Sequence, residues 1–313
     1  KMGPMSFSEF LLALDENLLL KKMSNWAQKR KTISEVVHKS LLNLFQKYLL
    51  VGGMPKAVLV YKKTKSLLQV RKIQKEILQT YKDDFMKYSR KTSQLEMLSK
   101  VFDYVPFHLG EKVKYSEIDQ DSKSRDLKRA IELLVFAKVI TPVVHSNASG
   151  LPLSFYKDEN VYKLYFLDIG LVGAILETPL HESLAIMDTA SGPLAEQFVA
   201  QHLQWYLNTD IHFQVFYWMK DKVPSKSEID FMFQSGTQIY PIEVKAGTAG
   251  KLKSLHQFCV EKKTKIAFQI SLHPFQVESV QYRIYQNQEK IELSGKLVKL
   301  PFYLIEYLLQ SLK

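Results

Sequence analysis

The sequence predicts an α+β protein that ends in an α/β domain. Two observations predict this class. The first third of the chain carries apolar residues at helical spacing, and the last third contains strand-like runs between two helical segments. A hydrophobic content of 46% over 313 residues can bury more than one core, which excludes disordered chains and small disulfide-stabilised proteins. We expect three parts, at residues 1–92, 93–178 and 179–313.

The first part, residues 1–92, is predicted to be all-helical. Apolar residues recur at intervals of three and four over residues 34–50, and again over residues 70–85. A Gly-Gly-Met-Pro segment at residues 52–55 ends the first of these two helices.

All of the excess positive charge lies in this first part. The formal net charge is +11, and residues 1–95 hold 19 Lys and Arg against 7 Asp and Glu, whereas residues 96–313 hold 24 against 25. A basic segment attracts phosphate backbones regardless of their sequence. Lysine-rich helices with solvated faces are the alternative interpretation.

Composition also predicts the compartment. Cys259 is the single cysteine, which excludes intramolecular disulfides and a thiolate zinc cluster and fits a reducing environment. No apolar run approaches the ~18 residues that a membrane helix requires, so we expect a cytoplasmic protein with no membrane partner. Because the chain begins with Lys1 and not Met, we expect it to start partway through a longer gene product.

The middle part is predicted to be a winged-helix domain, because three helices precede two strands. These elements are expected at residues 95–105, 116–118, 122–138, 139–144 and 161–167. The third helix of such a domain presents basic residues to DNA. Its basic residues are Lys123, Arg125, Lys128 and Arg129. Asp121, Asp126 and Glu132 dilute this charge, so packing against protein is the competing interpretation.

The last part shows the order α-β-β-β-α-β. Its elements are expected at residues 192–206, 213–218, 227–233, 238–245, 251–261 and 265–270. Gly192 is the expected N-cap of the first helix, with Pro193 at its first helical position.

Strict alternation in the strand at residues 227–233 sorts its side chains onto two faces. Glu228, Asp230 and Met232 are expected on one face, and Ile229, Phe231 and Phe233 on the other. In the next strand Glu243 and Lys245 share a face. We therefore expect Asp230, Glu243 and Lys245 to lie together, beside the helix that carries Glu196.

This group of side chains suits a hard divalent cation, because Mg²⁺ and Mn²⁺ bind carboxylate and carbonyl oxygens. Asp230, Glu243 and the backbone carbonyl of Val244 are the candidate ligands. Lys245 would orient or help deprotonate an attacking water and stabilise charge on a scissile phosphate. The chemistry fits phosphodiester hydrolysis, and a Glu243–Lys245 salt bridge without catalysis is the alternative.

The order of Glu196, Asp230 and Glu243-Val244-Lys245 resembles the PD-(D/E)XK nuclease superfamily, whose core is the restriction-endonuclease-like α-β-β-β-α-β fold. The resemblance implies Asp230 and Glu243 as metal ligands, Lys245 as the catalytic lysine and Glu196 as an accessory acid. It also implies a supporting polar role for Gln257 on the following helix.

Segments 5–11, 48–55 and 163–171 resemble one bacterial and archaeal family more closely. Its members join an AAA-type ATPase to a winged helix and a C-terminal nuclease-like domain. The resemblance implies that residues 1–92 are the helical C-terminal remnant of the ATPase, that the upstream ATPase domain is a partner, and that the protein can form a homo-oligomer. This chain has no Walker A or Walker B motif, so we expect ATP binding only through a missing upstream domain and no ATPase activity from this chain alone.

We therefore expect a metal-dependent, nuclease-like module of an AAA-type ATPase that acts on DNA. The alternative is a catalytically silent module of an ATP-binding AAA-type protein, which binds DNA or protein or has a regulatory role.

Overall fold

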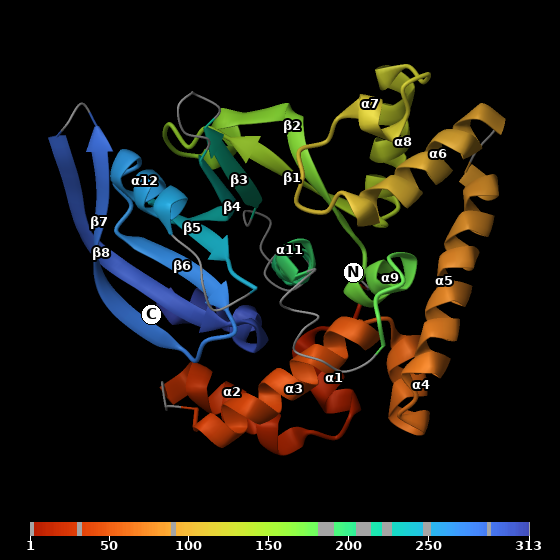
Figure 1. Cartoon of the computed structure of the whole chain (residues 1–313), viewed down its shortest axis with the longest axis horizontal. Helices are drawn as coiled ribbons and strands as arrows, with labels where there is room; N and C mark the ends of the chain where they lie inside the picture. The colour runs from red at the N-terminus through yellow and green to blue at the C-terminus, as the bar shows by residue number, and fades with distance from the viewer. Residues whose placement is uncertain are drawn as a thin grey trace. The chain divides into compact units, whose positions relative to one another are not determined.

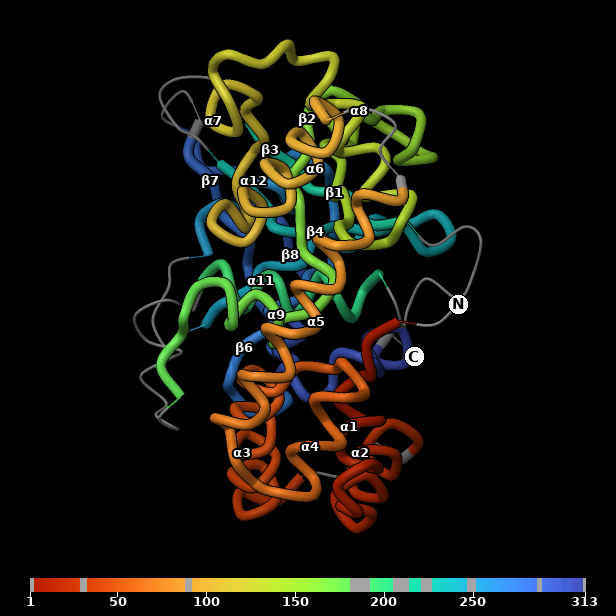
Figure 2. Tube along the Cα trace, turned by 90° about the vertical axis from the view of Figure 1, so that its right-hand side faces the viewer, coloured from red at the N-terminus to blue at the C-terminus, as the bar shows by residue number. Residues whose placement is uncertain are grey.

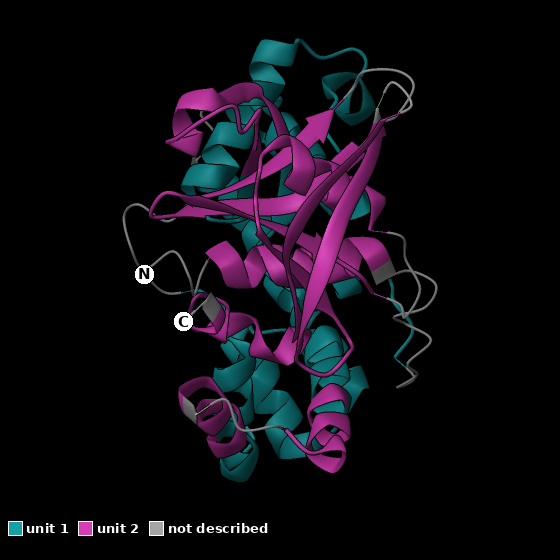
Figure 3. Cartoon of the chain, turned by 90° about the vertical axis from the view of Figure 1, so that its left-hand side faces the viewer, with its two compact units in different colours: residues 1–20, 43–142, 163–186 teal, residues 21–42, 143–162, 187–313 magenta. Residues whose placement is uncertain are grey.

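The computed structural model describes residues 3–29, 33–88, 92–180, 191–204, 214–220, 227–246, 252–286 and 289–312. These residues form helices and one mixed sheet (Figure 1), so the predicted α+β class is confirmed. The chain divides into two compact units (Figure 3). Unit 1 comprises residues 1–20, 43–142 and 163–186, and unit 2 comprises residues 21–42, 143–162 and 187–313. The three-part division made from the sequence stays a prediction.

The described part of residues 1–92 is helical, as predicted. Its helices are α1 (Phe7–Ala13), α2 (Asn17–Lys29), α3 (Glu35–Val51), α4 (Pro55–Thr64) and α5 (Leu67–Tyr88). Helix α3 ends directly before Gly52, whose φ of +72° suits glycine. Pro55 then starts α4. Among the residues that the structure covers, no helix is long and apolar enough to cross a membrane.

Aromatic side chains form the core of the helical part of unit 1, where α1 packs on α4 (Figure 2). The ring of Phe10 lies edge-on to Tyr48, with 5.3 Å between centroids, and stacks on Tyr61 at 6.4 Å. Phe10 and Tyr48 are fully buried. Burial of these large rings stabilises the helices of the basic part.

A buried carboxylate joins the three segments that carried the ATPase-family resemblance. Asp168 is fully buried and precedes α9 (Ile169–Ile175). Its oxygens accept hydrogen bonds from the N–H of Gly53 at 2.6 Å and of Leu171 at 3.1 Å. The Gly53 carbonyl in turn accepts from the N–H of Met5 at 2.6 Å. These motif residues therefore have an architectural role in unit 1.

The predicted three helices and two strands follow. They are α6 (Thr92–Tyr104), α7 (Tyr115–Ile118), α8 (Ser124–Phe136), β1 (Ile140–Ser146) and β2 (Lys157–Phe166), with short 3-10 turns η1 (Val105–Phe107) and η2 (Leu153–Tyr156). Helix α8 packs on α6 and buries Leu127, Ile131 and Leu134. Its apolar residues recur at intervals of three and four, which is why it forms an amphipathic helix.

The last part contains the predicted α-β-β-β-α-β order. Its elements are α11 (Ser191–His202), β3 (Val215–Lys220), β4 (Ser227–Ser235), β5 (Gln238–Val244), α12 (Lys253–Glu261) and β6 (Ile266–Ser271). Helix α11 begins one residue before the expected N-cap, so Gly192 and Pro193 lie inside its first turn. Such one-residue differences are usual at helix ends.

One mixed sheet of eight strands has the order β2-β1-β3-β4-β5-β6-β8-β7. Within unit 2, β1 pairs in parallel with β3 through Val144 and Phe216. The antiparallel pair β7 (Gln276–Gln286) and β8 (Glu289–Pro301) was not predicted. The first eight residues of β8 are all exposed or half-buried, so this segment lacks the alternation that marks a strand. The chain ends in the 3-10 turns η4 (Phe302–Tyr307) and η5 (Leu309–Leu312).

Helix α12 covers one face of this sheet (Figure 1), where Phe258 packs edge-on against Trp218 at 5.2 Å. Ile229 and Met232 both belong to this core cluster although they are three residues apart. The pairing with β3 explains this, because β4 advances from Ile229 to Met232 while β3 advances only from Trp218 to Phe216. The strict alternation predicted for β4 was wrong, because a β-bulge interrupts it.

Candidate functional site

Asp230 lies in this bulge, where the pairing of β4 with β5 ends. The final pair of that ladder joins Phe231 to Ile242. Beyond this pair, a side chain replaces the backbone partner: the N–H of Val244 donates to Oδ2 of Asp230 at 2.7 Å. The carboxylate thus takes the place of a strand carbonyl and is held beside Glu243. Bulges near active sites commonly redirect a side chain in this way.

The two carboxylate oxygens of Glu243 have different surroundings. Oε1 accepts a hydrogen bond from Nζ of Lys245 at 2.6 Å. Oε2 is buried and has no hydrogen-bond partner among the described residues. Burial and the neighbouring charge of Asp230 raise the pKa of Glu243 to about 7, although Lys245 acts in the opposite direction. An ionised carboxylate at this position therefore lacks part of the compensation that a buried charge needs.

Lys245 follows the last residue of β5, and its backbone N–H donates to the carbonyl of Ile270 in β6 at 2.8 Å. Burial by itself lowers the pKa of Lys245, but the charges of Glu243, Asp230 and Glu196 outweigh burial and raise it. The side chain is therefore an ammonium ion at neutral pH. An ammonium ion can stabilise negative charge, but it has no lone pair with which to accept a proton from water. Of the two roles expected for Lys245, the structure therefore favours charge stabilisation.

Glu196 reaches the same group from α11. This helix packs against β5, and the half-buried Glu196 is close enough to Lys245 for its charge to raise the lysine pKa. The structure thus places the side chains of Glu196, Asp230, Glu243 and Lys245 in one neighbourhood within unit 2. Strand alternation and the Glu-x-Lys spacing indicated this neighbourhood. They did not indicate the bulge, which depends on the register in which β4 pairs with β3.

Gln257 has partners that sequence reasoning missed. Its Oε1 accepts a hydrogen bond from the hydroxyl of Ser227, and its Nε2 donates to Glu261 at 2.9 Å. Lys220 of β3 donates to the same Glu261 oxygen at 2.6 Å. These bonds tie α12 to the ends of β3 and β4. Gln257 therefore helps to fix the start of β4, the strand that carries Asp230.

The donor set fits a hard divalent cation. It consists of two neighbouring carboxylates, one with a buried oxygen that has no partner among the described residues, and the backbone carbonyl of Val244, the residue whose N–H binds Asp230. Oxygen ligands of this kind are those that Mg²⁺ and Mn²⁺ prefer. A bound cation would also neutralise the charge that burial disfavours at Glu243.

The four basic residues singled out on α8 lie on its exposed side. Lys123, Arg125, Lys128 and Arg129 are all exposed, and Arg125 lies 3.8 Å from the carboxylate of Asp126. The arrangement presents positive charge to solvent and agrees with either a DNA-facing or a protein-facing surface.

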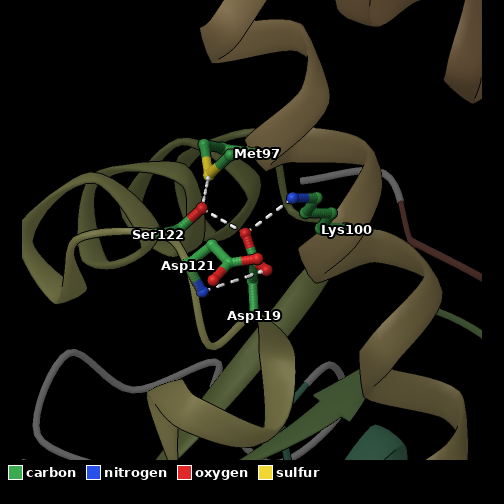
Figure 4. Close-up of polar contacts among 5 residues, drawn as sticks. All are labelled: Met97, Lys100, Asp119, Asp121 and Ser122. Atoms are coloured by element: carbon green, nitrogen blue, oxygen red, sulfur yellow. Dashed lines mark hydrogen bonds and ion pairs between the residues drawn. The ribbon is translucent and has the colours of Figure 1, made fainter.

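The turn that starts α8 is fixed by Asp119 (Figure 4). The hydroxyl of Ser122 and Nζ of Lys100 both donate to Oδ2 of Asp119, the second at 2.6 Å. The Ser122 hydroxyl also lies 3.2 Å from the sulfur of Met97. Because Lys100 and Met97 belong to α6, this network holds the basic helix at a defined position against its neighbour.

Two family models match the chain. A domain of unknown function (DUF8612) matches residues 42–182, and a second domain of unknown function (DUF4143) matches residues 191–303. DUF4143 is found in AAA-ATPase-associated proteins, so the sequence resemblance holds at this coarse level. The DUF4143 match includes all four side chains of the candidate site. No curated protein matches the chain.

Proposed function

We propose that this chain contains a metal-dependent, nuclease-like site that hydrolyses phosphodiester bonds of DNA, within an AAA-ATPase-associated protein. The observation that carries the proposal is the buried Oε2 of Glu243, which has no hydrogen-bond partner among the described residues and lies beside Asp230. A buried carboxylate oxygen left in this way is costly unless a cation binds it.

The roles of the residues follow from their surroundings. Asp230, Glu243 and the Val244 carbonyl would hold Mg²⁺ or Mn²⁺, which supplies Lewis-acid polarisation and lowers the pKa of water when bound. Lys245, held as an ammonium ion, would stabilise the negative charge that develops on a scissile phosphate oxygen. Glu196 would keep Lys245 protonated and oriented. The exposed basic residues of α8 are proposed to contact the DNA backbone.

A catalytically silent module that binds DNA or protein, or regulates the ATPase, is the second candidate. One observation favours it: Glu243 and Lys245 already form an ion pair with 2.6 Å between Oε1 and Nζ. In a catalytically silent module, this ion pair would only stabilise the end of β5.

Cleavage of linear, single-stranded and branched DNA in Mg²⁺ or Mn²⁺ separates the two candidates. Lys245→Met should lower the cleavage rate by about 100-fold or more, since removal of one group that stabilises transition-state charge has an effect of this size. Lys299→Met is the matched control, because Lys299 pairs with Glu278 at the same 2.6 Å and is 23% exposed, against 25% for Lys245. The control should cleave like the wild type.

Two results would contradict the nuclease proposal. Cleavage that persists in Lys245→Met would place the activity elsewhere. A folded wild type that binds Mn²⁺ and cleaves none of these DNAs would favour the silent module.

A further inference from the structure

A second group of potential metal ligands lies in unit 1, between α6 and the end of α7. One ligand atom each of His108, Glu111 and Glu117 lies within 4.8 Å of the other two. Gly110, with φ of +74°, turns the chain so that Glu111 comes back toward His108. None of these residues belongs to the site described above.

His108 is oriented as metal-binding histidines usually are. Its Nδ1 lies 3.1 Å from the backbone carbonyl of Tyr104. A carbonyl oxygen only accepts, so Nδ1 must carry the hydrogen, and Nε2 keeps the lone pair that a metal needs. The imidazole also stacks on the Tyr104 ring, with 3.9 Å between centroids. A hydrogen bond from the second ring nitrogen is the arrangement that fixes tautomer and ring orientation in metal sites.

An independent observation concerns the Tyr104 hydroxyl. The Tyr104 side chain is 7% exposed, and its buried hydroxyl makes no hydrogen bond of good geometry with the described residues. Burial, followed by the charge of Glu117, raises the pKa of Tyr104 to about 12, and smaller contributions come from the charge of Glu111 and from the approach of the hydroxyl to the Glu117 side chain. The hydroxyl is therefore close to both carboxylates and remains protonated. It is a donor without an acceptor of good geometry, and a water bound to a metal there would supply one.

We propose that His108, Glu111 and Glu117 bind one divalent transition-metal ion of the Zn²⁺ class, with water as the fourth ligand and Tyr104 as its hydrogen-bond donor. An imidazole nitrogen selects such ions over Mg²⁺, and one nitrogen with two carboxylates and a water completes a four-coordinate shell. The ion would tie η1 to α7 and so brace the helices that precede the basic helix α8.

Lys114 is the competitor of the metal at this site. Its Nζ donates to Oε1 of Glu117 at 2.6 Å and thus supplies positive charge in the absence of an ion. Removing the charge with Lys114→Gln should tighten Zn²⁺ binding, because the ion then no longer displaces an ammonium group from Glu117.

Calorimetric titration of the full chain with Zn²⁺ tests the site, in a Glu243→Gln background that disables the candidate nuclease site. We expect one Zn²⁺ per chain, weakened at least about tenfold by His108→Asn or Glu111→Gln and about tenfold by Tyr104→Phe. Lys114→Gln should bind more tightly. Glu132→Gln, at an exposed glutamate of α8, is the control and should bind like its background. Circular dichroism of each variant confirms folding.

Replacement of Zn²⁺ by Co²⁺ gives a second readout. An intense visible d–d band should appear in the background protein, since such a band reports a four-coordinate ion, and it should be lost in His108→Asn, which removes one of the four ligands. Unchanged Zn²⁺ affinity in both His108→Asn and Glu111→Gln would overturn the proposal. That result would not bear on the nuclease proposal, because Glu243→Gln has already disabled the candidate nuclease site in every variant of this series.

Discussion

Glu243 and Asp168 show how differently two buried carboxylates can be satisfied in one chain. Asp168 accepts two backbone hydrogen bonds at 2.6 and 3.1 Å. Glu243 has one lysine partner and one oxygen with no partner among the described residues. A carboxylate that is surrounded by donors stabilises a fold, whereas one that is partly unpartnered is better explained by a ligand.

The raised pKa of Glu243 predicts a pH-dependent stability. The folded-state pKa is about 7, above the unfolded value of about 4.3, so between these values only the folded state holds the proton. Raising the pH from 5 to 8 therefore lowers the free energy of unfolding of the wild type. Glu243→Gln removes this titration. Relative to the wild type, the variant should gain about 2–3 kcal/mol between these pH values.

Urea unfolding at pH 5 and pH 8, with a chelator present, measures this difference. Glu278→Gln, at another lysine-paired glutamate of the sheet, is the control. Parallel pH profiles for the wild type and Glu243→Gln would contradict the raised pKa.

We expect the small chemical change Asp168→Asn to lower the free energy of unfolding strongly. Asp168→Asn leaves the shape of the side chain but turns an amide NH₂ toward one of the two backbone N–H donors. The loss of a charge-assisted hydrogen bond and an unsatisfied buried donor should cost about 2–4 kcal/mol in the free energy of unfolding. Asp83→Asn on the exposed side of α5 is the control and should change little. Equal urea midpoints for the two variants would contradict the architectural role of Asp168.

At the scale of elements, much of the fold was predictable because it is local. The apolar spacing of residues 34–50 and 122–138 predicted α3 and α8. The paired hairpin β7–β8 was missed because the first eight residues of β8 are all exposed or half-buried. The bulge at Asp230 was missed because it arises from pairing with β3, which sequence alternation within β4 cannot report.

The candidate site was predictable in its residues but not in its electrostatics. The residue types and spacing of Asp230, Glu243 and Lys245 indicated a shared neighbourhood. The oxygen of Glu243 that has no partner among the described residues depends on burial, and the raised pKa of Lys245 depends on the charges of Glu243, Asp230 and Glu196. Only the tertiary structure sets both.

Helix α8 carries a prediction about DNA contacts. Arg125→Gln with Lys128→Gln should weaken DNA binding for every DNA sequence tested and lower the slope of log affinity against log salt by about 2, if both residues contact phosphates. Glu132→Gln on the same helix is the control. Fluorescence anisotropy across a salt series measures both quantities, and an unchanged slope would favour a protein-facing role for this helix.

At the scale of the whole molecule, the uneven charge predicts where nonspecific DNA affinity resides. Lys63, Lys65 and Lys72 are exposed in the basic first part of the chain. Converting all three to Gln should lower the salt slope by up to about 3. Exposed lysines from the charge-balanced remainder form the control set, namely Lys253, Lys263 and Lys296. Equal losses from the two triple variants would show that the first part has no special share in DNA binding.

Mn²⁺ titration at pH 8 tests whether the half-buried carboxylate of Asp230 and the buried carboxylate of Glu243 hold a divalent cation. A His108→Asn background removes the second proposed site, and the Mn²⁺ electron paramagnetic resonance signal reports the free ion. One Mn²⁺ should bind, and Asp230→Asn should weaken the affinity at least about tenfold, as expected for loss of a charged oxygen ligand. Equal Mn²⁺ affinity in the folded Asp230→Asn variant would contradict a cation site at Asp230 and Glu243.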